Sequence, residues 1–92
     1  LGIAAVVCRA EFAWPCEWAI STIDCETGGT FDPNAHGHEY YQGHWWHFVG
    51  LWQIAIQGHG GYEWLTDPYR NTVEANLKYL ASGAAPWPVC GQ

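Results

Sequence analysis

The chain has 92 residues, and nine acidic side chains against three basic ones give it a formal net charge of −6. So few Lys and Arg residues cannot neutralise a run of phosphates, which excludes nucleic acid as the partner and also argues against an anionic membrane surface. A chain of this length buries only enough apolar surface for marginal stability, so we expect residues 1–92 to form a single domain with covalent reinforcement.

Four cysteines can supply that reinforcement, namely Cys8, Cys16, Cys25 and Cys90. Four thiols allow three pairings, and spacing alone does not choose among them. The absence of a Cys-x-x-Cys pair argues against a zinc ribbon or a redox centre, so we expect two disulfides and a secreted protein. No apolar run approaches the roughly 20 residues of a membrane span. Because the chain starts on Leu rather than Met, we expect either that residues precede it or that a signal peptide has been removed.

Two helices are expected in the first third of the chain. The first covers residues 1–9 and ends before Pro15. The second covers residues 15–26, with Pro15 in its first turn and a stop at Gly28 and Gly29. Its apolar residues recur at helical spacing and predict a buried stripe of Cys16, Ala19, Ile20 and Ile23.

Glu26 stands out among the acids of this second helix. At about 100° per residue it projects within roughly 20° of Ala19, on the edge of the buried stripe, whereas Thr22 and Asp24 fall on the other side. A carboxyl on the apolar side of a helix loses hydration, and its pKa rises. Glu26 is therefore a candidate acid catalyst, whereas an ordinary helix-end carboxylate would be fully solvated.

The residue composition changes in the middle of the chain, and helical periodicity is lost there. A turn is expected at residues 32–34, and an irregular β-hairpin over residues 36–48, which are rich in Tyr, Trp, Phe and Gly. Residues 50–57 suit either a strand end or a short helix. A flexible glycine-rich loop over residues 58–61 and one helical turn over residues 62–65 follow.

The last helix has a clear start and stop. Asp67 is the expected N-cap, Pro68 the first helical residue, and Gly83 the end. Its expected apolar stripe consists of Val73, Leu77, Leu80 and Ala81. Residues 84–92 form an irregular tail. The fold class is therefore α+β, mainly helical, with a small β-insert.

Several segments in this order resemble the lysozyme-like transglycosylases of the soluble lytic type. They are Cys-Glu-Thr-Gly-Gly at 25–29, Phe-Asp-Pro-Asn-Ala at 31–35, Gly-Leu-Trp-Gln-Ile at 50–54, and the spaced Trp64, Asp67-Pro68, Asn71 and Tyr79-Leu80. Two features depart from the family pattern: Thr27 stands where Ser is usual, and the His-rich aromatic insert is long. The resemblance implies a lysozyme-like fold and a muramidase that cleaves the β-1,4 bond between N-acetylmuramic acid and N-acetylglucosamine in peptidoglycan, without a cofactor or a metal.

The chain ending resembles the catalytic domains of resuscitation-promoting factors. Residues 85–90 read Ala-Pro-Trp-Pro-Val-Cys. In those proteins the cysteine before the catalytic glutamate is bridged to the one after Trp-Pro. The resemblance therefore implies a Cys25–Cys90 disulfide, which leaves Cys8 to pair with Cys16, and a monomer that is secreted or associated with the cell wall.

The same resemblance assigns roles around Glu26, the expected general acid and then general base. A hydrolytic route needs a second carboxylate to activate water, for which Glu39 is preferred to Asp32, whose competing role is in a turn. Glu39 is otherwise a solvated loop acid. Substrate-binding roles are expected for Gln53, Tyr79, Asn71, Trp52, Tyr41 and Trp46.

These binding roles have structural alternatives. Tyr79 can orient Glu26 through a hydrogen bond or simply pack, and Asn71 can hold the loop before its helix. Trp52 suits the core or the cleft floor better than direct contact. Aromatic rings on the hairpin, Tyr40 and Trp45 as well as Tyr41 and Trp46, offer flat faces on which sugars stack. About half of the seven tryptophans are expected in the core.

Four histidines lie close together in the insert, as the ligands of a zinc site would. They are His36, His38, His44 and His47. Imidazoles at this spacing on a hairpin can converge on zinc, but Glu39 would be the one nearby carboxylate and no cysteine is expected to be free. We therefore expect a rim of solvated histidines.

Two other functions are consistent with the same family resemblance. A non-catalytic glycan-binding module would retain the aromatic cleft without cleaving sugars, and a chitin or chitosan hydrolase would use the same fold on a different polymer.

Overall fold

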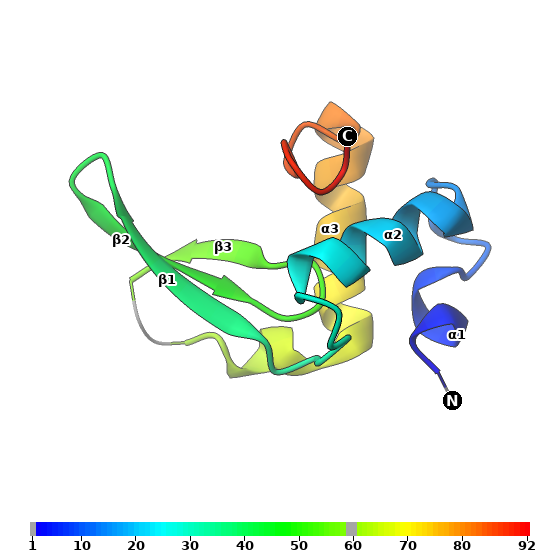
Figure 1. Ribbon diagram of the computed structural model, residues 1–92, viewed down its shortest axis with the longest axis horizontal. Coiled ribbons are helices and arrows are strands. Elements are labelled where there is room, and N and C mark those ends of the chain that lie inside the picture. Colours follow the sequence, from blue (N-terminus) through cyan, green and yellow to red (C-terminus); the bar gives the residue numbers. More distant parts are fainter. Residues whose placement is uncertain (1, 59–60) are drawn as a thin grey trace.

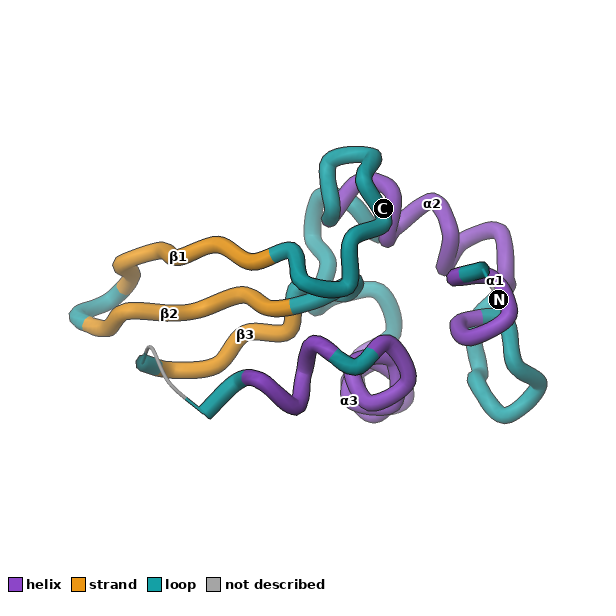
Figure 2. Tube along the Cα trace, turned by 90° about the horizontal axis from the view of Figure 1, so that it is seen from below, coloured by secondary structure: helices purple, strands orange, loops and turns teal. Residues whose placement is uncertain are grey.

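The computed structural model describes residues 2–58 and 61–92 and has an α+β architecture (Figure 1). Its elements in chain order are α1 (Ile3–Val7), α2 (Cys16–Glu26), β1 (His36–Tyr41), β2 (His44–Val49), β3 (Ile54–Gln57), the 3-10 helix η1 (Glu63–Thr66) and α3 (Pro68–Ser82). Helix α3 lies between the sheet on one side and α1 on the other, as Figures 1 and 2 both show. Among the described helices, none combines the length and the apolar character needed to cross a membrane.

The helix bounds follow the expected signals closely. Helix α2 starts one residue after Pro15, and Asp67 caps α3 by accepting a hydrogen bond from the Arg70 amide at 2.9 Å. Gly83 ends α3 with a φ of 61°. The first helix is shorter than predicted; Leu1, its predicted first residue, lies outside the described residues, as do residues 59–60 of the predicted glycine-rich loop.

The sheet is more regular than the predicted hairpin. Its three antiparallel strands lie in the order β1-β2-β3, and β1 pairs with β2 residue for residue from His36↔Val49 to Tyr41↔His44. Gln42 and Gly43 join them, with φ values of 51° and 85°. Two left-handed residues form the tight turn whose twist matches that of paired strands, so the register stays continuous. Residues 54–57 become a third strand rather than a helix.

The core is organised around an aromatic cluster. Ring centroids of neighbouring members lie 4.4 to 6.0 Å apart, and the members are Trp14, Trp18, Trp52, Tyr79 and Trp87. Three of the seven tryptophans are buried and Trp18 is partly buried, which confirms that about half fill the core. The tilted and edge-to-face arrangements suit the charge distribution of aromatic rings.

The indole N–H groups of this cluster hold distant segments of the chain. Trp14 donates to the Val7 carbonyl at 2.8 Å, and Trp18 donates to the Gly91 carbonyl at 2.8 Å. Trp87 donates to the Trp52 carbonyl at 2.9 Å. A buried indole needs such a partner, because an unpaired N–H loses its hydrogen bond to water. The cluster therefore fixes the end of α1 and the C-terminal tail together.

The apolar stripe predicted for α3 is right at Val73, which is partly buried against the core, but wrong at Leu77, Leu80 and Ala81, which are exposed. Leu77 and Leu80 are 57% and 63% exposed, while Asn71, Thr72 and Ala75 are the buried residues. The helix turns its small and polar face inward because the large rings of the cluster fill the space opposite. The Thr72 hydroxyl donates to the Pro68 carbonyl and accepts from the Trp52 indole, so its burial leaves no polar group unpaired.

The stripe predicted for α2 is right at Ala19 and Ile23, and Ile20 is partly buried against the core. It is wrong at Cys16, which is exposed, and about Thr22, which is buried. Its hydroxyl donates to the Trp18 carbonyl at 2.8 Å. A threonine that bonds the carbonyl four residues earlier presents mainly its methyl group to its neighbours, so it packs as a small apolar residue.

Two disulfides join Cys8 to Cys16 and Cys25 to Cys90. This confirms the pairing that the family resemblance implied. The second disulfide ties the tail to α2 one residue before Glu26. It closes a sequence separation of 65 residues, against 8 for the first.

The two disulfides are expected to differ in their effect on stability. The chain-entropy model assigns about 4 kcal/mol to the Cys25–Cys90 loop and about 2.5 kcal/mol to the Cys8–Cys16 loop. Urea unfolding of the paired Cys→Ala variants should show the larger loss for the Cys25/Cys90 pair. An equal or smaller loss for that pair would contradict the loop-entropy explanation.

Candidate functional site

Glu26 is the last residue of α2 and is partly buried. Burial raises the pKa of its carboxyl above the ordinary value. Within the described part of the chain, no hydrogen bond or ion pair to this carboxyl is present. An acid that loses hydration without gaining a positive partner holds its proton to higher pH, which is the property required of a general acid. The helical projection of Glu26 onto the buried edge is confirmed.

The helix end that carries Glu26 is held by local hydrogen bonds. The buried Thr27 hydroxyl donates to the Ile23 carbonyl at 2.8 Å and accepts from the Phe31 amide at 3.0 Å. Gly28 and Gly29 follow with φ values of 63° and 84°, which favour glycine. Together with the neighbouring disulfide, these contacts fix the position of the Glu26 backbone.

The two candidates for a second carboxylate lie in different settings. Asp32 Oδ1 accepts from the Asn34 amide at 2.9 Å, which gives Asp32 the turn role that the sequence left open. Glu39 is exposed on β1, directly opposite Trp46 on β2. Residues alternate between the two faces of a sheet, so Glu39 shares one face with Tyr41, Trp46 and Phe48.

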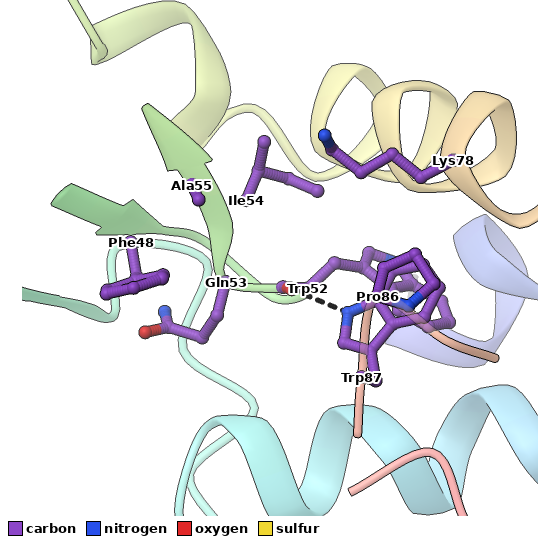
Figure 3. Close-up of a pocket in the computed structure, with 8 residues that line it drawn as sticks. All are labelled: Phe48, Trp52, Gln53, Ile54, Ala55, Lys78, Pro86 and Trp87. Atoms are coloured by element: carbon purple, nitrogen blue, oxygen red, sulfur yellow. Dashed lines mark hydrogen bonds between the residues drawn. The ribbon is translucent and has the colours of Figure 1, made fainter. Parts of the chain in front are cut away.

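A small cavity lies where this sheet face meets α3 and the tail (Figure 3). Its volume is about 130 Å³. The lining residues are Phe48, Trp52, Gln53, Ile54, Ala55, Lys78, Pro86 and Trp87. Complete small-molecule sites usually measure about 300–1,000 Å³, so this cavity suits one part of a sugar rather than a whole glycan.

Gln53 is the predicted binding residue that the structure places in this cavity. Its side-chain amide donates to the carbonyls of Ala35 and Gly50 at 3.0 and 2.9 Å. Its φ of 49° is unusual for a residue with a side chain and is held by these bonds. The Gln53 side chain lies beside Phe48 (Figure 3). Because its NH₂ group is engaged, its carbonyl oxygen is the acceptor that a ligand can use.

Asn71 takes the structural role that the sequence left as its alternative. It is fully buried, accepts from the Trp52 amide at 2.9 Å, and donates to the carbonyls of Val49 and Leu65 at 2.8 and 2.9 Å. A side chain at Gly50 would come within 2.8 Å of the Leu65 carbonyl and would also collide with Asn71. Contrary to the substrate-binding role predicted for it, Asn71 does not reach a surface where a ligand could bind.

Trp52 and Tyr79 also belong mainly to the core. Trp52 is fully buried, although it lines the floor of the cavity. The Tyr79 ring lies 5.0 Å from Trp18 and 5.6 Å from Trp14, measured between centroids. Among the described residues, Tyr79 makes no hydrogen bond to Glu26, so the orienting role considered for it is not seen and packing is what the structure supports.

The hairpin aromatics are divided between the two faces of the sheet. Tyr41 is 56% exposed, and its carbonyl accepts from the Trp46 indole at 3.3 Å, on the face that also carries Glu39. Tyr40 and Trp45 form an edge-to-face pair on the opposite face, with centroids 5.3 Å apart. Only Tyr41 and Trp46 are therefore positioned on the cavity side.

Three of the four predicted rim histidines gather on the face away from the cavity. His36 Nδ1 lies 3.1 Å from His47 Nε2, and the His38 and His47 rings stack with centroids 4.2 Å apart. His47 is only 1% exposed because Tyr62 packs against it, so the predicted solvated rim is wrong at this position. His44 lies on the other face. Within residues 2–58 and 61–92, no set of three or more His, Cys, Asp or Glu side chains is arranged to hold a metal.

Lys78 and Phe48 line the cavity but were not among the predicted site residues. Nothing in the sequence marks Lys78, since it is one surface lysine on a helix. Trp87 was part of the Trp-Pro segment that indicated the disulfide, yet its position in the cavity depends on how the tail packs.

Comparison with known proteins gives no relative: no family model matches the chain, and no curated protein or solved structure is significantly similar to it. The lysozyme-like assignment thus stays a prediction based on the motifs.

The raised pKa of Glu26 predicts a pH-dependent effect on stability. A carboxyl with a raised pKa binds more protons folded than unfolded, so its contribution is lost as pH rises from the unfolded value of about 4.3 through the folded pKa. Glu26→Gln should therefore raise the free energy of unfolding at pH 7, and the gain should vanish below about pH 4.

Glu17→Gln is the matched control for this experiment, because Glu17 is exposed in the first turn of the same helix. A carboxylate there interacts favourably with the helix dipole, so its loss should not raise stability at pH 7. Urea unfolding at pH 3.5, 5 and 7 measures both variants. A stabilisation by Glu26→Gln that is equal at all three pH values would argue against the burial effect.

The buried hydrogen bonds of Asn71 predict a large structural penalty. Asn71→Ala leaves one amide and two carbonyls unpaired in the interior, at about 1–3 kcal/mol each, so we expect a loss of about 3 kcal/mol or more. Asn76→Ala removes a single 3.3 Å bond on the same helix and should cost about 0.5 kcal/mol. Chemical unfolding of the two variants compares them directly, and similar losses would be evidence against the role given to Asn71.

Proposed function

We propose that this protein is a muramidase that cleaves the β-1,4 bond between N-acetylmuramic acid and N-acetylglucosamine in bacterial peptidoglycan. The observation that carries the proposal is the partly buried Glu26 carboxyl, whose pKa is raised by burial at a helix end fixed by a disulfide. The ordered motifs from residues 25–29 to the tail support the substrate class. Function rests on the site rather than on the fold class, which many unrelated activities share.

Glu26 acts first as the acid. Its proton passes to the glycosidic oxygen as the bond to the anomeric carbon breaks, so the leaving sugar departs as a neutral alcohol and positive charge develops on the remaining ring. Where a hydroxyl of the same sugar attacks the anomeric carbon, the Glu26 carboxylate then takes the proton of that hydroxyl. A carboxyl of ordinary pKa would be ionised at neutral pH and would have no proton to deliver.

The attacking group decides the product. Water gives a reducing muramic acid, and its activation on the opposite side of the ring requires a second carboxylate. Internal attack by a hydroxyl of the same sugar gives an anhydro product and requires none. Glu39 is the candidate for the first route because it lies on the sheet face that leads to the cavity, together with Trp46 and Tyr41 as surfaces for sugar stacking.

Two disulfides fit an oxidising compartment, which is where peptidoglycan is reached from outside the cytoplasm. We therefore place the protein outside the cell or at the cell wall, acting as a monomer on glycan strands. The acidic net charge gives no basis for a role with nucleic acid.

Glu26→Gln should reduce peptidoglycan cleavage by about 100-fold or more, the usual contribution of a general acid. Release of soluble fragments from purified cell walls measures the rate. Because the same variant is expected to unfold less readily at pH 7, the loss of activity cannot be attributed to loss of structure. Retained cleavage would show that Glu26 is not the general acid.

Glu39→Gln separates the two routes when the products are analysed by mass spectrometry. An anhydromuramyl end is lighter than a reducing end by one water. Loss of reducing-end products in the Glu39 variant identifies the hydrolytic route, whereas unchanged anhydro products exclude a catalytic role for Glu39. A wild-type protein that binds glycan strands but releases no fragments would instead be a glycan-binding module.

A further inference from the structure

Lys78 lies at the edge of the cavity, on α3 (Figure 3). Its side chain extends along the helix, and its amino group points toward Ile54 at the start of β3. Most of the other lining groups are apolar or aromatic, with the Gln53 amide as the polar exception. The ammonium group is therefore the one charge among the residues that line this cavity.

The other two basic residues are used or placed elsewhere. Arg9 forms an ion pair with Glu11 at 2.8 Å and lies over the Tyr69 ring. Arg70 lies in the first turn of α3, two turns before Lys78. Among the described residues, Lys78 has no carboxylate within ion-pair distance. A lysine at a cavity in a chain of net charge −6 and without an acidic partner is available to an anionic ligand.

The floor of the cavity suits the uncharged part of such a ligand. Trp52, Trp87 and Pro86 offer ring surfaces, and Trp87 is held rigidly by its hydrogen bond to the Trp52 carbonyl. Flat apolar surfaces match the C–H face of a sugar ring. A sugar resting there would place its substituents between Gln53, in the turn before β3, and Lys78 on α3, which line the same cavity.

We propose that Lys78 is a specificity-determining residue that pairs with a carboxylate on the glycan, so that the cavity selects peptidoglycan over chitin or chitosan. This inference rests on the proposed function. Peptidoglycan carries carboxylates, either on the lactyl group of muramic acid when the stem peptide is absent or on the stem peptide itself. Chitin is neutral and chitosan is cationic, so neither gains from an ammonium group at this position.

Binding measurements with the inactive Glu26→Gln protein test this inference, because the glycans then stay intact. The probes are glycan strands with stem peptides, strands freed of stem peptides, and a chitin hexasaccharide, followed by tryptophan fluorescence. Adding Lys78→Gln should weaken binding of carboxylated strands about three- to tenfold at 50 mM salt, the range of a partly exposed ion pair, and raised salt should remove the difference. Chitin affinity should change less than twofold.

Arg70→Gln is the matched control, since it removes the same charge from the same helix away from the cavity. It should leave all three affinities unchanged. An effect limited to strands freed of stem peptides identifies the lactyl carboxylate as the partner, and an effect limited to intact strands identifies the stem peptide.

The failure of this inference is separable from failure of the proposed function. Equal weakening for chitin and carboxylated strands, or an equal effect of Arg70→Gln, overturns the role of Lys78 while cleavage by the wild type still supports a muramidase. Carboxylate-dependent binding through Lys78 without any cleavage by the wild type would support the role of Lys78 and contradict the proposed muramidase function. Absence of binding to all three glycans would contradict both the role of Lys78 and the proposed muramidase function.

Discussion

The burial of the tryptophan cluster, with its indole N–H groups paired to backbone carbonyls, is the constraint on which the rest of this structure depends. Trp14 and Trp18 connect the core to the end of α1 and to the C-terminal tail, and Trp87 connects the tail to Trp52. A small domain has little apolar area to bury, so large rings with satisfied polar atoms supply an unusual share of its stability. The disulfide between Cys25 and Cys90 reinforces the same junction.

The candidate site is a consequence of that junction. Packing of the tail brings Trp87 and Pro86 against the start of β3, which creates the cavity beside Lys78 and Gln53. The disulfide and the Thr27 hydrogen bonds hold the end of α2, where the Glu26 carboxyl is partly buried. The requirements of stability and of catalysis conflict at Glu26. A dehydrated carboxylate lowers the free energy of unfolding at neutral pH, whereas a carboxyl that stays protonated can act as a general acid.

Most residues of the motif at 50–54 and its partner in α3 have structural roles. Gly50 leaves room for Asn71, Asn71 satisfies three backbone groups, and Trp52 belongs to the core. Within residues 50–54, Gln53 is the residue that lines the cavity with a side-chain polar atom available to a ligand. A segment that resembles a motif of an enzyme family can thus have structural roles as well as catalytic ones.

Local chemistry let the sequence by itself determine the helix bounds at Pro15, Asp67 and Gly83, and helical periodicity placed Glu26 on a buried edge. The disulfide pairing came from the family resemblance. Tertiary packing decided which residues are buried where periodicity did not predict it. The large rings face the small side of α3, which leaves Leu77 and Leu80 exposed. Tyr62 packs against His47 and buries it. The cavity beside Lys78 also required the tertiary structure, because its walls come from three separate parts of the chain, and contacts between distant segments leave no local signal.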